Sequence, residues 1–246
     1  MDGTAVKALE EAFRSPQIVG EGFIATPINW TVKDQASFIT PGPTAEALGV
    51  YTLGALRDYI TANRDALDRT TLVVHVVSPQ VVRLVGPLQA RARNREAYVQ
   101  AQATNLTDGF LGKFMAIDEF IVGLQTRFAD EHGRADVLKL FGNVKHEGVK
   151  TLADDGVTQT VTAKAGVVLA NEVAVPNPVT LTPFRTFREV LQPASPFALR
   201  VTGATSGTLT VGLFEADGGA WRITAVERIR GWLEAELTGN DVAVLA

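Results

Sequence analysis

The stretch TLVVHVVSPQVVRLV, residues 71–85, consists largely of β-branched residues, with a serine and a proline in its middle. Branched side chains pack well on a pleated surface, so the run is typical of strands. Ser78 and Pro79 break the run, and residues 80–85 resume it. The stretch therefore predicts two strands joined as a hairpin.

Helical periodicity precedes this hairpin. Thr52 can cap a helix that ends between Asn63 and Asp68, and its apolar side is formed by Leu53, Leu56, Tyr59 and Ile60. Residues 4–13 also have helical spacing, and short strands or extended arms are expected at 23–26 and 28–32. The first part of the chain is thus predicted to mix helices with strands.

The middle of the chain favours helices, because no proline occurs between Pro87 and Val175. Asp118 can cap a helix whose apolar stripe contains Ile121, Leu124 and Phe128. A second helix is expected over residues 134–141, with Gly142 as its stop.

After residue 149 the pattern becomes extended. Asp154-Asp155-Gly156 is typical of a hairpin turn, and residues 157–163 alternate as in a half-buried strand. Further strands are expected at 166–170, 173–175, 179–182, 197–201 and 208–214. A helix with a broad apolar face, from Trp221 to Leu237, follows a Gly-Gly turn and should dock on a sheet.

These patterns predict an α+β fold with a mixed N-terminal α/β part, a helical middle and a mostly antiparallel β C-terminal part closed by an amphipathic helix. Three regions are expected: 1–43, an N-terminal helix and extended arm; 44–148, an α/β region with a hairpin and helices; and 149–246, a β-rich region with the C-terminal helix.

Composition excludes several kinds of chemistry. Without cysteine the chain has no disulfide, thiol nucleophile, iron–sulfur cluster or cysteine-ligated zinc. The net charge of −4 argues against a protein that binds duplex DNA or an anionic lipid surface, because such a protein is expected to have a broad positive field. The N-terminus does not read as a secretory signal, and no apolar run approaches a membrane-spanning length, so a cytoplasmic protein is expected.

No catalytic constellation stands out. The three histidines lack metal-ligand spacing; His75 is expected in the core, His132 and His146 at the surface. The serine elbow, the P-loop and the dinucleotide fingerprint are absent from the sequence. We therefore predict no cofactor, no metal and no catalytic residue, and we lean toward a protein that is not an enzyme.

Arginine clusters are the candidate ligand contacts. Arg83, Arg91, Arg93 and Arg95, with Tyr98 close behind, have the composition of a single-strand binder, or of the solvated face of a helix. Arg185, Arg188 and Arg200 can pair with Glu215 and Asp217 as structural ion pairs, or bind phosphates. The helix expected after the Gly-Gly turn begins near Arg222, and the free backbone N–H groups at its N-terminus could bind the same phosphates.

Several segments resemble a family of phage- and prophage-encoded proteins of unknown function, itself distantly similar to YfdQ-like prophage proteins. The resemblance covers roughly residues 44–237 and lies in residues 53–60, 74–79, 154–159, 176–197 and 214–222, including Phe184-Arg185-Thr186-Phe187. It implies a virus-derived protein in the bacterial host cytoplasm, and it carries over no catalytic residue.

Three functions are compatible with the sequence. The first is a non-enzymatic, homo-oligomeric phage accessory protein that binds a nucleotide signal of host defence or a single-stranded nucleic acid. The second is a virion structural or assembly protein with interlocking arms. The third is a metal-dependent hydrolase or nuclease that uses carboxylates such as Asp154, Asp155, Glu215 or Asp217.

Overall fold

The computed structural model describes residues 45–89, 93–147, 149–154, 159–165, 168–203 and 209–246, together with two short strands near the N-terminus. Within 143–174 it describes only the backbone. The chain forms two compact units, Met1–Glu46 with Leu88–Asn94, and Ala47–Pro87 with Arg95–Ala246. In the first unit, β1 (Gln17–Ile18) pairs antiparallel with β2 (Ile24–Ala25). The helix predicted over residues 4–13 lies outside the described residues.

A five-stranded sheet of the second unit contains the predicted hairpin, β4 (Val73–Ser78) and β5 (Val81–Val85). The strand order is β14-β4-β5-β6-β3, with β3 at Leu48–Val50, β6 at Ala97–Gln102 and β14 at Ala243–Leu245. The central pairs are antiparallel, and each edge strand runs parallel to its neighbour.

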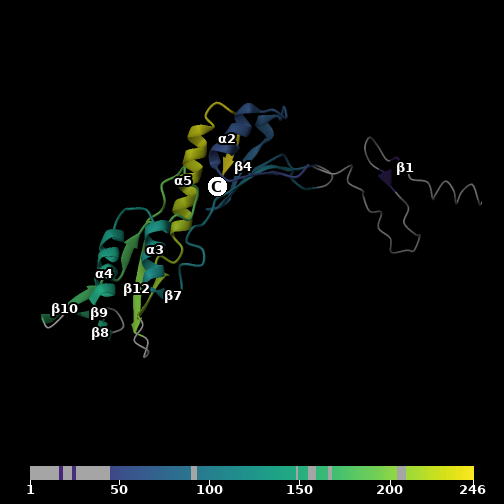
Figure 1. The fold of residues 1–246 in the computed structure, drawn as a ribbon. Helices are drawn as coiled ribbons and strands as arrows, with labels where there is room; N and C mark the ends of the chain where they lie inside the picture. Colours follow the sequence, from purple (N-terminus) through teal and green to yellow (C-terminus); the bar gives the residue numbers. More distant parts are fainter. Residues whose placement is uncertain are drawn as a thin grey trace, which may run out of the picture. The chain divides into compact units, whose positions relative to one another are not determined.

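Helices α2 (Leu53–Ala62) and α5 (Trp221–Glu236) pack on one face of this sheet (Figure 1). Thr52 caps α2, since its hydroxyl accepts a hydrogen bond from Ala55 N at 3.1 Å, and Asn63 ends α2 in the left-handed conformation. A short 3₁₀ helix, η1 (Arg69–Thr71), leads into β4. The core between these layers contains Leu53, Leu56, Val74, Val82, Leu84, Val99, Ile229 and Leu233. The predicted helix, cap and docking surface are confirmed.

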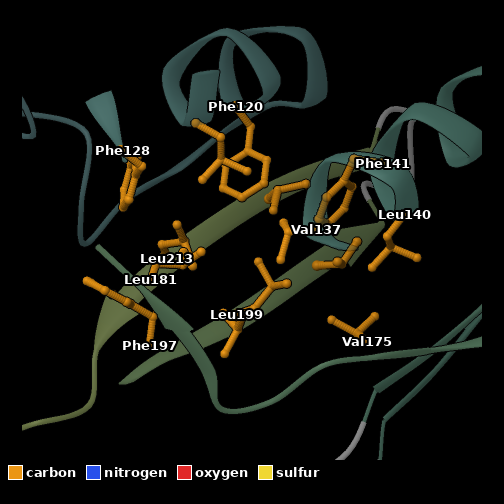
Figure 2. Packing of buried hydrophobic residues seen from close by; sticks show 14 of the residues in the cluster. Phe120, Phe128, Val137, Leu140, Phe141, Val175, Leu181, Phe197, Leu199 and Leu213 are labelled. Carbon is orange, nitrogen blue, oxygen red and sulfur yellow. The ribbon is translucent and has the colours of Figure 1, made fainter. Parts of the chain in front are cut away.

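A four-stranded antiparallel sheet has the order β11-β12-β13-β7, with β11 at Val179–Leu181, β12 at Ser195–Gly203, β13 at Leu209–Glu215 and β7 at Phe114–Ala116. Helices α3 (Ile117–Arg127) and α4 (Arg134–Glu147) supply its second layer. Figure 2 shows side chains of both helices, such as Phe120 and Phe141, pointing toward Leu199 and Leu213 of the sheet.

Three further strands form a small antiparallel sheet of order β10-β9-β8: β8 (Val149–Asp154), β9 (Gln159–Ala165) and β10 (Val168–Val175). The antiparallel pairing of β8 with β9 confirms the two strands of the hairpin predicted here, and its turn, residues 155–158, lies outside the described residues. The α+β class is likewise confirmed. The chain on either side of residue 148 is intertwined: β7 pairs with β13 in the four-stranded sheet, and α2 packs beside α5 on the five-stranded sheet.

Several local predictions are wrong. The stretch around Arg95 leads into strand β6 instead of forming a helix, and α4 continues past Gly142 to Glu147. Helix α3 begins at Ile117, with Asp118 inside its first turn and no side chain capping its N-terminus. The predicted C-terminal helix is present as α5, and the chain adds the unpredicted short strand β14 after it.

Candidate ligand-binding surfaces

Arg185 is a structural residue at the centre of a polar cluster. Its side chain is 1% exposed, donates to Glu215 Oε1 at 2.7 Å and also hydrogen-bonds Ser195. Its guanidinium lies 3.9 Å from the centre of the Trp221 ring, a cation–π contact. Burial lowers the pKa of Arg185 to about 10, and Glu215 and Asp217 oppose that shift. Arg185 therefore stays charged at neutral pH, and its ion-pair interpretation is confirmed.

The predicted anion position before α5 is filled by Asp217. Its carboxylate accepts hydrogen bonds from Gly219 N at 2.9 Å, from Trp221 N at 3.2 Å and from Ser195 Oγ at 2.9 Å. Burial alone would raise the pKa of Asp217, but these hydrogen bonds and the Arg185 charge outweigh it and hold the pKa below its ordinary value. The backbone donors that we expected for a ligand phosphate thus serve an internal carboxylate.

A second internal carboxylate occupies the N-terminus of α2. Glu189 Oε1 accepts a hydrogen bond from Gly54 N at 3.1 Å. Glu189 belongs to the crossing segment, residues 182–194, which joins β11 to β12. The crossing segment also bonds to the β4–β5 turn, because Gln80 Nε2 donates to Arg185 O at 2.9 Å and Thr186 Oγ1 donates to Pro79 O at 2.5 Å. The crossing segment thus connects the four-stranded sheet, to which β11 and β12 belong, with α2 and the β4–β5 hairpin.

Of the remaining candidate arginines, Arg222 lies beside this cluster, close enough for its charge to act on Arg185, and the others that the structure describes lie apart from it. Arg188 is exposed, and its Cζ lies 3.6 Å from the centre of the Phe184 ring. The Cζ of Arg222 lies 5.0 Å from the centre of the Trp221 ring. Arg93 and Arg95 are exposed in the β5–β6 connection, where Arg95 donates to Gly86 O at 3.2 Å. Arg91 lies outside the described residues.

Arg83 stands on the face of the five-stranded sheet opposite α2 and α5. Cross-strand register places it in one row with Leu245, His75, Gln100 and Gly49, one residue from each strand. Its Nε donates to Gln100 Oε1 at 2.8 Å, and its side chain is exposed. His75, predicted in the core, is half-buried on this outer face because Val74 and Val76 take the core positions.

A second open face was missed by the sequence analysis. On the four-stranded sheet, Val211 and Leu213 point into the core, so Gly212 and Phe214 lie on the opposite face. Register places Gly212 between Arg200 of β12 and Phe114 of β7. The alternation of residues 209–215 carried this signal, but β7 is too short to be recognised from its sequence.

A hollow of about 330 Å³ lies beside α3, lined in part by Asp118, Glu119, Val122 and Arg127. Arg127 donates to Leu106 O at 3.1 Å and lies 5.4 Å from the Phe110 ring. Its cation thus holds the 105–111 loop against the helix.

Histidines and carboxylates do not assemble into a metal site within the part of the chain that the structure describes. His132 Nδ1 lies 3.0 Å from Thr182 Oγ1, and its side chain is 45% exposed, as predicted for a surface residue. The side chains of His146, Asp154 and Asp155 lie outside the described residues. Among the described helices, none has the length and apolar character to cross a membrane.

No protein-family model, curated protein or solved structure matches this chain.

Proposed function

We propose that this chain is a non-enzymatic phage accessory protein that assembles as a homo-oligomer in the host cytoplasm and binds an anionic ligand, a nucleotide or a nucleic acid. One observation supports the ligand class. The open face of the five-stranded sheet presents the exposed Arg83 beside His75, and its described outward residues include no Asp or Glu.

The absence of carboxylates from the described outward residues of this sheet face is informative because the chain as a whole is acidic. The whole chain carries −4, with 27 acidic residues against 23 basic ones. A sheet face without carboxylates on such a chain is a local region where an anion meets less repulsion than elsewhere on the surface. By contrast, the N-termini of α2 and α5 already hold Glu189 and Asp217. A ligand phosphate is therefore expected on the open sheet faces.

The proposal is tested by measuring the affinity of the purified chain for labelled single-stranded DNA over a range of salt concentrations. Each phosphate contact contributes roughly 0.7 to the slope of log affinity against log salt for a single strand. Arg83→Ala is expected to lower the slope by about that amount, whereas Arg230→Ala, on α5 behind the sheet, is expected to leave it unchanged. Equal slopes and affinities for wild type and Arg83→Ala would contradict the proposed ligand surface.

The oligomer is tested on the same samples by native mass spectrometry. A discrete multimer is expected at micromolar protein. A strict monomer with and without DNA would remove self-association from the proposal and leave ligand binding standing.

A further inference from the structure

The open face of the four-stranded sheet carries an exposed aromatic pair. Phe114 of β7 is 45% exposed, although it belongs to a strand whose next residue, Met115, lies in the core. Its ring packs edge to face against Phe214 of β13, with centroids 5.4 Å apart and an interplanar angle of 62°. The two rings come from strands distant in the sequence and meet on the face opposite α3 and α4.

Gly212 allows the two rings to converge. A Cβ at this position would stand 2.9 Å from Phe214 Cε2, 3.2 Å from Phe114 Cδ1 and 3.1 Å from the carbonyl oxygen of Lys113. Any side chain here would push at least one ring aside. The rings therefore cover the backbone of Gly212, and the half-exposed Phe114 ring presents apolar surface to solvent.

The surroundings of this aromatic pair are small or cationic. Arg200 lies across from Gly212, and the flanking outward positions are Ala198, Thr202, Thr210 and Ala116. Thr202 and Thr210 hydroxyls hydrogen-bond each other at 2.7 Å. Arg200 is the only charged residue among the described outward positions of these four strands. At ~4.8 Å between strands, the backbone of Arg200 stands roughly 10 Å from that of Phe114, two strands away.

We infer that this aromatic face binds unpaired bases of a single-stranded nucleic acid. An exposed ring on a flat sheet stacks on a nucleobase, and a nearby guanidinium contacts a phosphate of the same strand. A duplex offers its bases only at their edges, so a ring exposed on a sheet can stack only on unpaired bases. The inference rests on the proposed function and narrows its ligand from a general anion to a single strand.

The test compares three labelled ligands on the full chain: oligothymidylate of about 12 nucleotides, an abasic strand of equal length, and the matching duplex. The abasic strand keeps the phosphates and lacks the bases. Stacking predicts that oligothymidylate binds at least about fivefold more tightly than either other ligand. Because this comparison uses the wild-type chain, it does not depend on the folding of any variant.

Variants assign the effect to the ring. Phe114→Leu keeps an apolar side chain and removes the π face, so oligothymidylate affinity is expected to fall about fivefold or more while abasic affinity is unchanged. Phe114→Trp is expected to restore binding. Tyr51→Leu, at an 80% exposed aromatic outside this sheet, is the matched control and is expected to have no effect.

The outcomes separate the two proposals. Equal affinity for oligothymidylate and the abasic strand, with no effect of Phe114→Leu, would overturn the stacking inference and leave the anion-binding proposal intact. Failure of every strand to bind would overturn both. Tighter binding to the duplex would likewise overturn the single-strand inference.

Discussion

Arg185 illustrates how far a residue's role depends on partners distant in the sequence. As a sequence position, it was compatible with an ion pair and also with a phosphate contact. In the fold, Glu215, Ser195 and Trp221 surround it. The charge is buried but paired, and an unpaired guanidinium at 1% exposure would be very costly. Neither the burial nor the choice of partner is encoded locally, so the sequence left both interpretations open.

Asp217 gives this cluster a pH dependence. Its pKa in the folded protein lies below its ordinary value, whereas in the unfolded chain it returns to about 3.9. A carboxyl with a lowered folded pKa stabilises the fold above the unfolded pKa, and this contribution is lost as the pH falls through the folded pKa. We expect the free energy of unfolding to decrease below about pH 4 partly through this group.

Urea unfolding at pH 7 and at about pH 3 checks this expectation. Asp217→Asn is expected to be less stable than wild type at pH 7 and to lose less stability on acidification, because one titrating group has been removed. Glu227→Gln, at an exposed position on α5, is the control and should retain the wild-type pH dependence. An identical pH dependence for Asp217→Asn and wild type would contradict the assigned role.

At the scale of elements, local signals were predicted well. The β4–β5 hairpin and α2 with its Thr52 cap follow from neighbouring residues, and they were found where expected. Strands β7 and β14 were missed, because each has three residues and is held by pairing with a strand far away in the sequence. The aromatic pair could not be predicted for the same reason: it exists only once β7 pairs with β13.

Helix α3 offers a prediction about packing. A Cβ on Gly123 would stand 2.0 Å from Phe110 Cε2, and Phe110 is itself buried against Phe120 and Phe128. Gly123→Ala is therefore expected to lower the free energy of unfolding by about 1–2 kcal/mol, as overpacking outweighs the gain in helix propensity.

The matched control is Gly231→Ala in α5, where nothing lies within 4 Å of the added Cβ. This substitution should raise stability by about 0.5–1 kcal/mol, because alanine favours the helix and meets no obstacle. Chemical unfolding of both variants measures the two changes in the free energy of unfolding, which are expected to have opposite signs. Stabilisation by Gly123→Ala would show that Phe110 does not pack against α3 as described.

The two larger sheets of the second unit share the same arrangement of layers. Each has helices packed on one face, and no described helix covers the other. One open face presents Arg83, the other Phe114 and Phe214 near Arg200, and the described outward residues of both lack carboxylates. The internal carboxylates Glu189 and Asp217 are used at helix N-termini instead. This distribution of charge is the basis for proposing that the open faces meet a polyanion.

Photo-crosslinking tests this account most directly. A single strand carrying 5-iodouracil is bound to the wild-type chain and irradiated, and the modified peptides are mapped by mass spectrometry. We predict adducts on Phe114 or Phe214, competed by unlabelled oligothymidylate and not by the abasic strand. Adducts found only at residues outside the four-stranded sheet, or none at saturating strand, would contradict base stacking on this sheet.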